Sequence, residues 1–333
     1  MSVFRKLLNN YYYGKSGKGE YRRGDLPQNR WQQFREMLRV RLAGLFRLNL
    51  ITALAFVPMI YVLIITLSAL LTHLAVVAEA SANPQSPVFS GNSAQEVYSI
   101  LFTGSLLLIP AIAITGPAQA GMALVVRNWA RDEHAFVWSD FLDAVKGNWK
   151  QALGASLMTG VVPLVVLVSY QFYGAMAENS TFFVVPQMLV IGLGVIWSLA
   201  LVYMYPMMVT YKMSFRTLLR NSLLLAMGRL PHTAGARLVM LIPVAAAVVV
   251  SLATPNWMYA VMALAGYYLL FGNALARFVY AALSNAMFDR LINVRIPGAQ
   301  VNRGLAEVED IDEGEEDEPD APTGPQNKPG SLV

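Results

Sequence analysis

The charged residue that lies deepest in a long apolar run is Arg277, and Asn273 precedes it by one helical turn. Because an ionised group in hydrocarbon is costly, an arginine in a membrane segment is by default a candidate for ligand or ion recognition. Arg277 comes about 20 residues after Trp257, where the run begins, so span-length arithmetic puts it near one membrane face. This favours a side chain that snorkels to that face. The alternative is a polar cavity lined by Asn273 and Arg277.

Other arrangements that could do chemistry are missing from the sequence. There is no cysteine, so thiolate metal sites and cysteine nucleophiles are excluded. The three histidines, His73, His134 and His232, are scattered, and no carboxylate pair lies in an apolar run. The stretch at 14–19, GKSGKG, lacks the spacing of a phosphate-binding loop. We therefore expect no enzymatic activity, no cofactor and no metal site.

A second feature is the Gly116-Pro117 pair inside an apolar run, with Gly121 one turn further on. Proline removes a backbone donor and crowds the preceding turn, which predicts a kink or break in the helix. Two interpretations stay open. A kink that only serves close helix packing is the favoured one, since small residues surround the proline. The other is a broken-helix site that offers free backbone groups to a ligand.

These residues must be positioned by membrane helices. The chain of 333 residues is 56% hydrophobic and only 14% charged, against about 25% charged in soluble domains. Six apolar segments are long enough to span a bilayer, which needs about 20 residues each. They cover 48–71, 98–126, 152–173, 183–210, 233–253 and 257–281. The predicted fold is all-α, a polytopic membrane bundle of six transmembrane helices.

The positive charges predict the orientation of this bundle. Residues 1–47 hold 11 of the 25 Lys and Arg, while the segments 72–97, 174–182 and 254–256 hold none. The positive-inside rule then places both termini in the cytoplasm, in a multi-pass protein of the cell membrane. Three regions follow: a basic N-terminal region at 1–47, a membrane domain at 48–297 and a tail at 298–333.

The two terminal regions have opposite charge, which the net charge of +4 conceals. Residues 29–48 predict an amphipathic helix, capped by Asn29 with Gln32, for the lipid headgroup layer or for packing on the bundle. The tail holds ten acidic and two basic residues, and all ten acids lie in 307–320. That composition predicts a disordered segment. It is either a solubilising tail or a docking segment, with the basic N-terminus as one possible partner.

The two cytoplasmic segments between spans, 127–151 and 212–232, concentrate aromatic and charged residues. In the first, Ser139 is expected to cap a short helix that Gly147 ends; in the second, Ser214 and Gly228 take those roles. We expect these segments to form a surface for a protein partner. Its candidate residues are Arg127, Trp138, Asp140, Phe141, Lys146, Trp149, Arg220 and Asn221.

The motif residues carry a family resemblance. They are Gly116-Pro117-Ala118 with Gly121, Trp138-Ser139-Asp140-Phe141 with Lys146 and Trp149, Leu218 to Ser222, and Leu230-Pro231-His232-Thr233. Over roughly residues 30 to 295 the chain resembles the YesL-like family, also called domain of unknown function 624. These are small integral membrane proteins, mainly of Gram-positive bacteria. The resemblance implies a possible accessory role in carbohydrate uptake, but no catalytic or ligand residues.

Three functions are left open by the sequence. The first is a non-catalytic membrane accessory protein whose cytoplasmic segments bind a transporter or signalling protein. The second is a small-solute transporter or permease that uses the Gly116-Pro117 break and the face with Asn273 and Arg277. The third is a lipid or potential sensor that acts through the N-terminal helix. The lipid bilayer is a partner in all three, and no nucleic acid is expected.

Overall fold

The computed structural model describes residues 26–82, 93–254 and 257–306, and all regular elements in these residues are helical. Six helices are long and apolar enough to cross a membrane, which confirms the six predicted spans. The predictions for the acidic run 307–320, for the stretch 14–19 and for residues 83–92 lie outside the described residues. The side of the membrane on which each helix ends stays a prediction.

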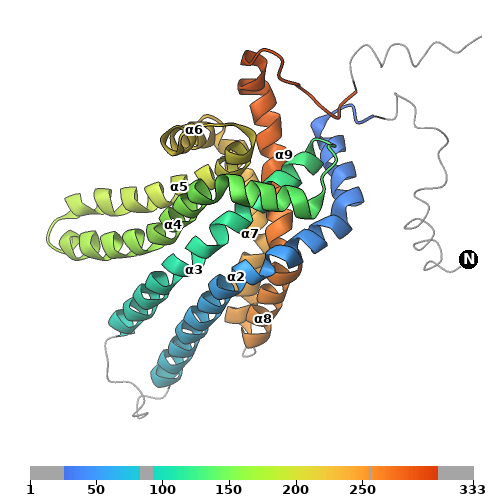
Figure 1. The fold of residues 1–333 in the computed structure, drawn as a ribbon. Coiled ribbons are helices and arrows are strands. Elements are labelled where there is room, and N and C mark those ends of the chain that lie inside the picture. Colours follow the sequence, from blue (N-terminus) through green and yellow to red (C-terminus); the bar gives the residue numbers. More distant parts are fainter. Residues whose placement is uncertain (1–25, 83–92, 255–256, 307–333) are drawn as a thin grey trace, which may run out of the picture. The chain divides into compact units, whose positions relative to one another are not determined.

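Most of the spanning helices extend beyond the predicted spans (Figure 1). In chain order they are α2 (Arg30–Ala82), α3 (Ser93–Ala130), α4 (Val137–Ala177), η2 (Thr181–Phe183), α5 (Val184–Thr210), α6 (Phe215–Gly228), α7 (Leu230–Ala253), α8 (Trp257–Tyr267), η3 (Tyr268–Gly272), α9 (Asn273–Leu291) and η4 (Asn293–Arg295). The expected interfacial helix and the first span are one continuous helix, α2.

The chain divides into two units. One is Phe34–Arg303, which contains the membrane helices; the other combines residues 1–33 and 304–333. In the second unit, the Ala306 amide donates to the Pro27 carbonyl at 3.0 Å. There Asn29 accepts a hydrogen bond from the amide of Gln32 at 2.9 Å, which confirms the predicted cap.

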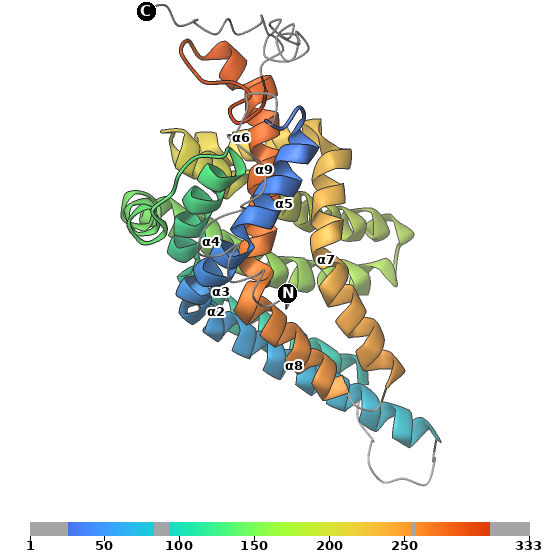
Figure 2. The same ribbon diagram turned by 90° about the vertical axis from the view of Figure 1, so that its right-hand side faces the viewer.

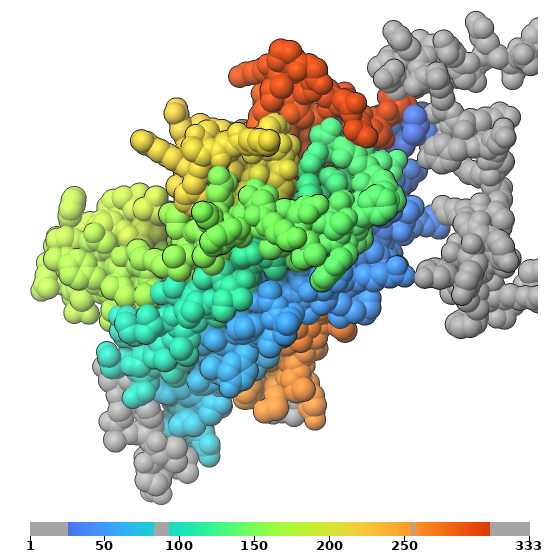
Figure 3. Space-filling model, in the orientation of Figure 1, coloured from blue at the N-terminus to red at the C-terminus, as the bar shows by residue number. Residues whose placement is uncertain are grey.

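The core of the larger unit lies where the C-terminal halves of α3 and α5 meet α2, α4, α6 and α9. Figure 2 shows how these helices are arranged. Large apolar side chains of the other halves, such as Leu106 of α3 and Leu189 of α5, are exposed. Exposed apolar faces on helices of this length match a lipid-facing surface. Helices α2 and α3 run side by side (Figure 3), where Gly104 lets Thr66 approach closely.

Of the two interpretations of Gly116-Pro117, the broken helix is wrong, since α3 is continuous from Ser93 to Ala130. Pro117 cannot donate to the Ala113 carbonyl one turn earlier, but the Ser156 hydroxyl of α4, which lies equally close to its own Ala152 carbonyl, can donate to the Ala113 carbonyl at 2.9 Å. A neighbouring side chain thus satisfies the group that the proline frees. A Cβ at Gly116 would overlap Ser156 and the Ala152 carbonyl, so Gly116 serves helix packing.

The same solution recurs at Pro206 in α5. This proline leaves the Val202 carbonyl without its helical donor, and the Ser284 hydroxyl of α9 donates to it at 3.2 Å. Both serines are fully buried. The prolines therefore fix which neighbouring helix packs against α3 and α5 at these levels.

The start of α4 also differs from the expectation. Phe136 is the N-cap residue and α4 begins at Val137, so Ser139 does not cap it; the Asp140 carboxylate instead accepts from the Phe136 amide at 3.1 Å. Gly147 does not end the helix, which continues to Ala177. Apart from the neighbouring backbone of α4, no described atom lies within 4 Å of a Cβ placed on Gly147, so no close contact there requires a glycine or a helix end.

Candidate functional site

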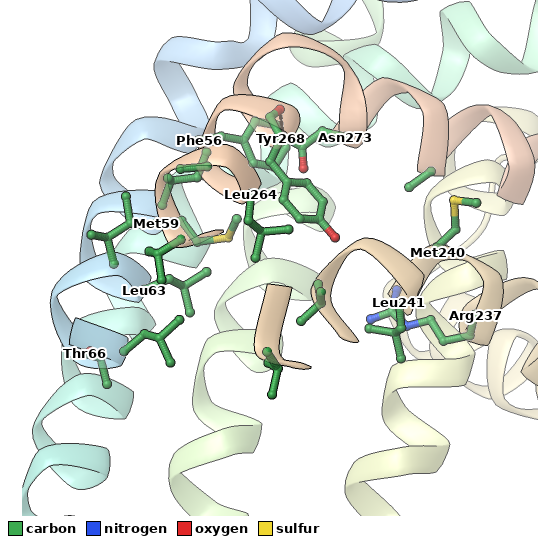
Figure 4. Close-up of a pocket in the computed structure, with 18 of the residues that line it drawn as sticks. Phe56, Met59, Leu63, Thr66, Arg237, Met240, Leu241, Leu264, Tyr268 and Asn273 are labelled. Carbon is green, nitrogen blue, oxygen red and sulfur yellow. Dashed lines mark hydrogen bonds between the residues drawn. The ribbon is translucent and has the colours of Figure 1, made fainter. Parts of the chain in front are cut away.

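A cavity of about 540 Å³ opens between α2, α7, α8 and α9 (Figure 4). Its volume falls in the range of small-molecule sites, about 300–1,000 Å³. Most lining side chains are apolar, with Phe56, Met59 and Leu63 on α2 and Leu241 on α7. The few polar groups come from Thr66, Gln119, Arg237, Tyr268, Asn273, Arg277 and Tyr280. We call this space the Arg277 cavity.

Arg237 is the better satisfied of the two arginines in this cavity. Its Nε donates to the Ser198 hydroxyl at 3.0 Å, and its Nη1 donates to the Tyr280 hydroxyl at 3.0 Å. The guanidinium also lies 5.8 Å from the centroid of the Tyr280 ring. These contacts hold α7 against α5 and α9 and fix the guanidinium at the cavity wall.

Arg277 is less well satisfied. Its guanidinium carbon lies 4.2 Å from the centroid of the Tyr205 ring, and its Nη2 donates to the Gln119 side-chain oxygen. Its Nη1 is buried and has no hydrogen-bond partner among the described residues. Among the described lining residues there is no Asp or Glu. Two cations thus share one cavity without a carboxylate, an arrangement that fits an anionic ligand.

The helix that carries Arg277 is irregular just before it. Residues Tyr268–Gly272 form a π-helical segment, η3, a form that is frequent at functional sites. The side-chain amide nitrogen of Asn49 on α2 donates to the Tyr268 carbonyl at 2.9 Å and to the Leu269 carbonyl at 2.6 Å. The side-chain oxygen of Asn49 accepts from the backbone amide of Ala274. The Asn273 amide also donates to the Tyr268 carbonyl. Asn49 therefore stabilises the irregular turn beside the cavity.

The structure places both residues of the expected polar cavity, Asn273 and Arg277, along this wall. Arg277 turns inward, toward Gln119 and Tyr205, rather than along the helix. The sequence analysis missed Gln119, Arg237 and Asn49 as site residues. Arg237 carried a usable signal, because it lies inside an apolar segment, where a charge indicates function.

A second group of arginines lies at the C-terminal end of α3, and we call it the Glu133 cluster. The Glu133 carboxylate pairs with Arg131 at 3.0 Å, with Arg303 at 3.4 Å and with Arg127 at 3.9 Å. Arg131 also donates to the Gln300 carbonyl at 3.3 Å. The cluster ties the segment after α9 to the end of α3.

Tyr211 and Asp289 extend this polar region. The Tyr211 hydroxyl donates to the Asn293 oxygen at 2.6 Å, and the Asn293 amide donates to the buried Asp289 carboxylate at 2.6 Å. Burial, and then the Asp289 charge, raises the pKa of Tyr211 to about 12. The phenol therefore keeps its proton and acts as the donor to Asn293.

The expected partner surface is only partly a surface. Trp138 and Trp149 are 60% and 48% exposed. Phe141 is buried instead, because its ring packs against α3 at Gly121, which has no Cβ. A Cβ on Gly121 would come within 2.5 Å of the Phe141 ring. The remaining members are exposed or half-buried: Arg127, Asp140, Lys146, Arg220 and Asn221.

The segment 212–232 folds as expected. Ser214 caps α6, with its hydroxyl accepting from the Thr217 amide at 3.3 Å, and α6 ends at Gly228. The side-chain amide of Gln151 donates to the Met213 carbonyl at 2.9 Å, which joins the segments 127–151 and 212–232. Trp149 thus lies close in sequence to the point where they meet.

The fold, with six described helices long and apolar enough to cross a membrane, indicates a multi-pass membrane protein, and its cavity is mostly apolar with two arginines in the wall. Residues 97–170 match the model of a family described as "Protein of unknown function, DUF624". The chain is also 27% identical over 124 residues to the "Uncharacterized protein YesV" of Bacillus subtilis (strain 168). That alignment covers 37% of this chain and 58% of the relative, less than two thirds of its length. No solved structure matches the chain.

These two matches support the assignment to the DUF624, or YesL-like, family that the motif residues predicted. The matched region runs from α3 into α4 and includes Gly116, Gln119 and Phe141. It does not include Arg237 or Arg277.

Proposed function

We propose that this chain is a non-catalytic membrane protein that binds an anionic solute in the Arg277 cavity, as a permease does. The observation that carries the proposal is Arg277, which lines a cavity without a described carboxylate and whose buried Nη1 has no hydrogen-bond partner among the described residues. A buried cation that is not neutralised is costly. A bound anion would remove that cost, so occupancy of the cavity is coupled to the stability of the bundle.

The neighbouring η3 segment supports a role in transport. A π-helical turn inside an α-helix is rare, and it occurs frequently at functional sites. Here η3 comes directly before Asn273, which lines the cavity with Arg277. A change in cavity occupancy can therefore reach the helix backbone through one turn.

A screen by thermal stability tests the proposal. A ligand that binds only the folded state raises the midpoint of unfolding. We expect small carboxylates or phosphates to raise the midpoint of the detergent-solubilised wild type, but not that of Arg277→Gln. Neutral analogues should leave both unchanged. The exposed Arg290, also on α9, supplies the control Arg290→Gln, which should respond like the wild type.

Two results contradict the proposal: no anion stabilises the wild type, or the same anions stabilise Arg277→Gln equally. An anion that passes this screen can be followed by uptake into liposomes that contain the protein. Arg277-dependent uptake favours a permease, while binding without uptake favours a solute-responsive accessory protein.

A second proposal is the accessory role toward a carbohydrate-uptake system that the family resemblance implies. The observation that supports it is the exposure of Trp138 and Trp149, two aromatic side chains of the kind enriched in protein interfaces. Crosslinked membranes, a pull-down and the double variant with Trp138→Ala and Trp149→Ala test it. The proposal fails if the wild type captures no reproducible transporter component or if the double variant captures the same partners.

A further inference from the structure

We propose that the anion bound in the Arg277 cavity is an amphiphile, with its charged head at Arg277 and Arg237 and its apolar tail along α2, α7 and α8. This inference rests on the proposed function and names the class of its ligand. Two features carry it: both cations lie at one end of an elongated cavity, and the apolar remainder of that cavity opens toward the lipid-facing surface.

The two cations lie at the same end because Arg237 donates to Tyr280, which is one turn from Arg277 on α9. The cavity continues along α7 from Arg237 to Val248. At 1.5 Å per residue this distance is about 16 Å. Along this length the other described lining residues of α7 are apolar: Met240, Leu241 and Val244.

The wall opposite α7 is equally apolar. On α2 it is formed by Phe56, Met59, Ile60, Leu63, Ile64, Leu67 and Leu70, with Thr66 as the polar exception. A small hydrophilic anion would occupy the arginine end and leave this wall without contacts. An alkyl chain attached to the anion would cover the wall and gain the free energy of leaving water.

The apolar part of the cavity is open at the protein surface. Leu63 on α2 is 46% exposed, Leu241 on α7 is 43% exposed and Val248 is 42% exposed, although all three line the cavity. They belong to helices long and apolar enough to span a membrane, so their exposed faces meet lipid. An amphiphile can therefore enter sideways from the bilayer with its tail in hydrocarbon throughout.

The head group follows from the donors. A guanidinium presents five N–H donors and pairs best with the oxygens of a carboxylate or phosphate. Arg277 lines the cavity with one guanidinium nitrogen unpaired among the described residues, and Arg237 adds a second positive charge at the same end. A free fatty-acid-like carboxylate and the phosphate of an anionic membrane lipid share this chemistry, so the experiment must separate these two sources.

Photolabelling of the full chain in phosphatidylcholine nanodiscs tests the proposal. Three probes carry the same diazirine in one alkyl chain: palmitate, the matched palmityl alcohol and phosphatidylglycerol. We expect an anionic probe to label peptides from 56–70 and 240–265 in the wild type. Arg277→Gln should reduce this labelling about tenfold, the loss expected for a charge-assisted hydrogen bond. Arg277→Lys, which keeps the charge, should retain much of it, and Arg290→Gln should label like the wild type.

Labelling by palmitate alone identifies a free amphiphile, and equal labelling by phosphatidylglycerol identifies a membrane lipid; both support the proposal. It is overturned if the alcohol labels these peptides as strongly, or if labelling is spread evenly over lipid-facing helices. Loss of all labelling in Arg277→Lys, with that variant folded by gel filtration, also counts against it. If small water-soluble anions still stabilise the wild type through Arg277, only the amphiphile is excluded. If no anion does so, the proposed function fails with it.

Discussion

Two arginine clusters contact α3 at levels about 12 Å apart along its axis, since Gln119 and Arg127 are separated by two helical turns. In the Glu133 cluster, three arginines share one carboxylate, and Arg131 also donates to a backbone carbonyl. In the Arg277 cavity, two arginines meet hydroxyl groups, an amide oxygen and aromatic rings, but no described carboxylate.

This difference distinguishes charges that stabilise the fold from charges that we propose bind a ligand. In a buried ion pair, the attraction between the two charges offsets the free energy that both lose on leaving water. Removal of one member leaves the other charge buried without compensation. Arg131 therefore depends on Glu133 in the folded chain. Arg277 depends on a group that the described part of the chain does not supply, so its removal should cost the fold little and cost recognition much.

The first prediction tests the close packing of α3 against α4 at Gly116. In Gly116→Ala the new Cβ would overlap Ser156 and the Ala152 carbonyl, a backbone atom that cannot move alone. We expect destabilisation of about 3 kcal/mol or more, the upper end for overpacking. Thermal unfolding in detergent measures it. In the control, Gly147→Ala, no described atom lies near the Cβ, and it should stabilise α4 by about 0.5–1 kcal/mol. Equal effects of both changes would mean that α3 and α4 do not pack as closely as described.

The Glu133 cluster predicts the next largest effect. Glu133→Gln leaves Arg127, Arg131 and Arg303 with no carboxylate in the cluster, while the amide still accepts one hydrogen bond. We expect a loss of about 2 kcal/mol, below the 3–5 kcal/mol of a fully buried pair because Arg303 is half exposed. The same unfolding assay measures it, and the control Asp143→Asn changes an exposed carboxylate on α4. Anion binding by the Arg277 cavity should be unchanged in Glu133→Gln.

The sequence predicted the part of this fold that is local. Six spans follow from runs of apolar residues, and the caps by Asn29 and Ser214 follow from short spacings. The continuity of α3 could not be predicted, because the donor that compensates Pro117 is Ser156, 43 positions from the Ala113 carbonyl. Only packing brings that pair together.

The candidate site was likewise predictable from the sequence only in part. Arg277 and Asn273 stand out in the sequence, since charge and amide groups are rare in such a segment. Gln119 is 158 positions from Arg277, and Asn49 is 225 positions from Ala274, so neither contact leaves a sequence pattern. The cavity itself results from the space left between α2 and α7, which no residue type encodes.

Arg237 is an intermediate case that sharpens the comparison. It lines the cavity, yet its guanidinium donates to both Ser198 and Tyr280. In Arg237→Met we expect a loss of about 1 kcal/mol in unfolding free energy, from two hydrogen bonds of about 0.6 kcal/mol each in a membrane protein. Anion affinity should fall as well, but less than in Arg277→Gln. A variant with unchanged stability would show that these two bonds do not hold α7 in place.

Arg277→Met should have the smallest effect on stability and decides whether the two clusters differ in kind. Methionine fills a similar volume, removes a buried charge without a described carboxylate, and gives up contacts with Gln119 and Tyr205. Replacement of a buried charge by an apolar side chain is often neutral or stabilising, so we expect a change between zero and a gain of about 1 kcal/mol. Unfolding without added ligand measures this, and the same protein should no longer be stabilised by anions. A loss near that of Glu133→Gln would mean that Arg277 holds the bundle together as the Glu133 cluster does, because a charge kept for a ligand contributes little to the empty fold.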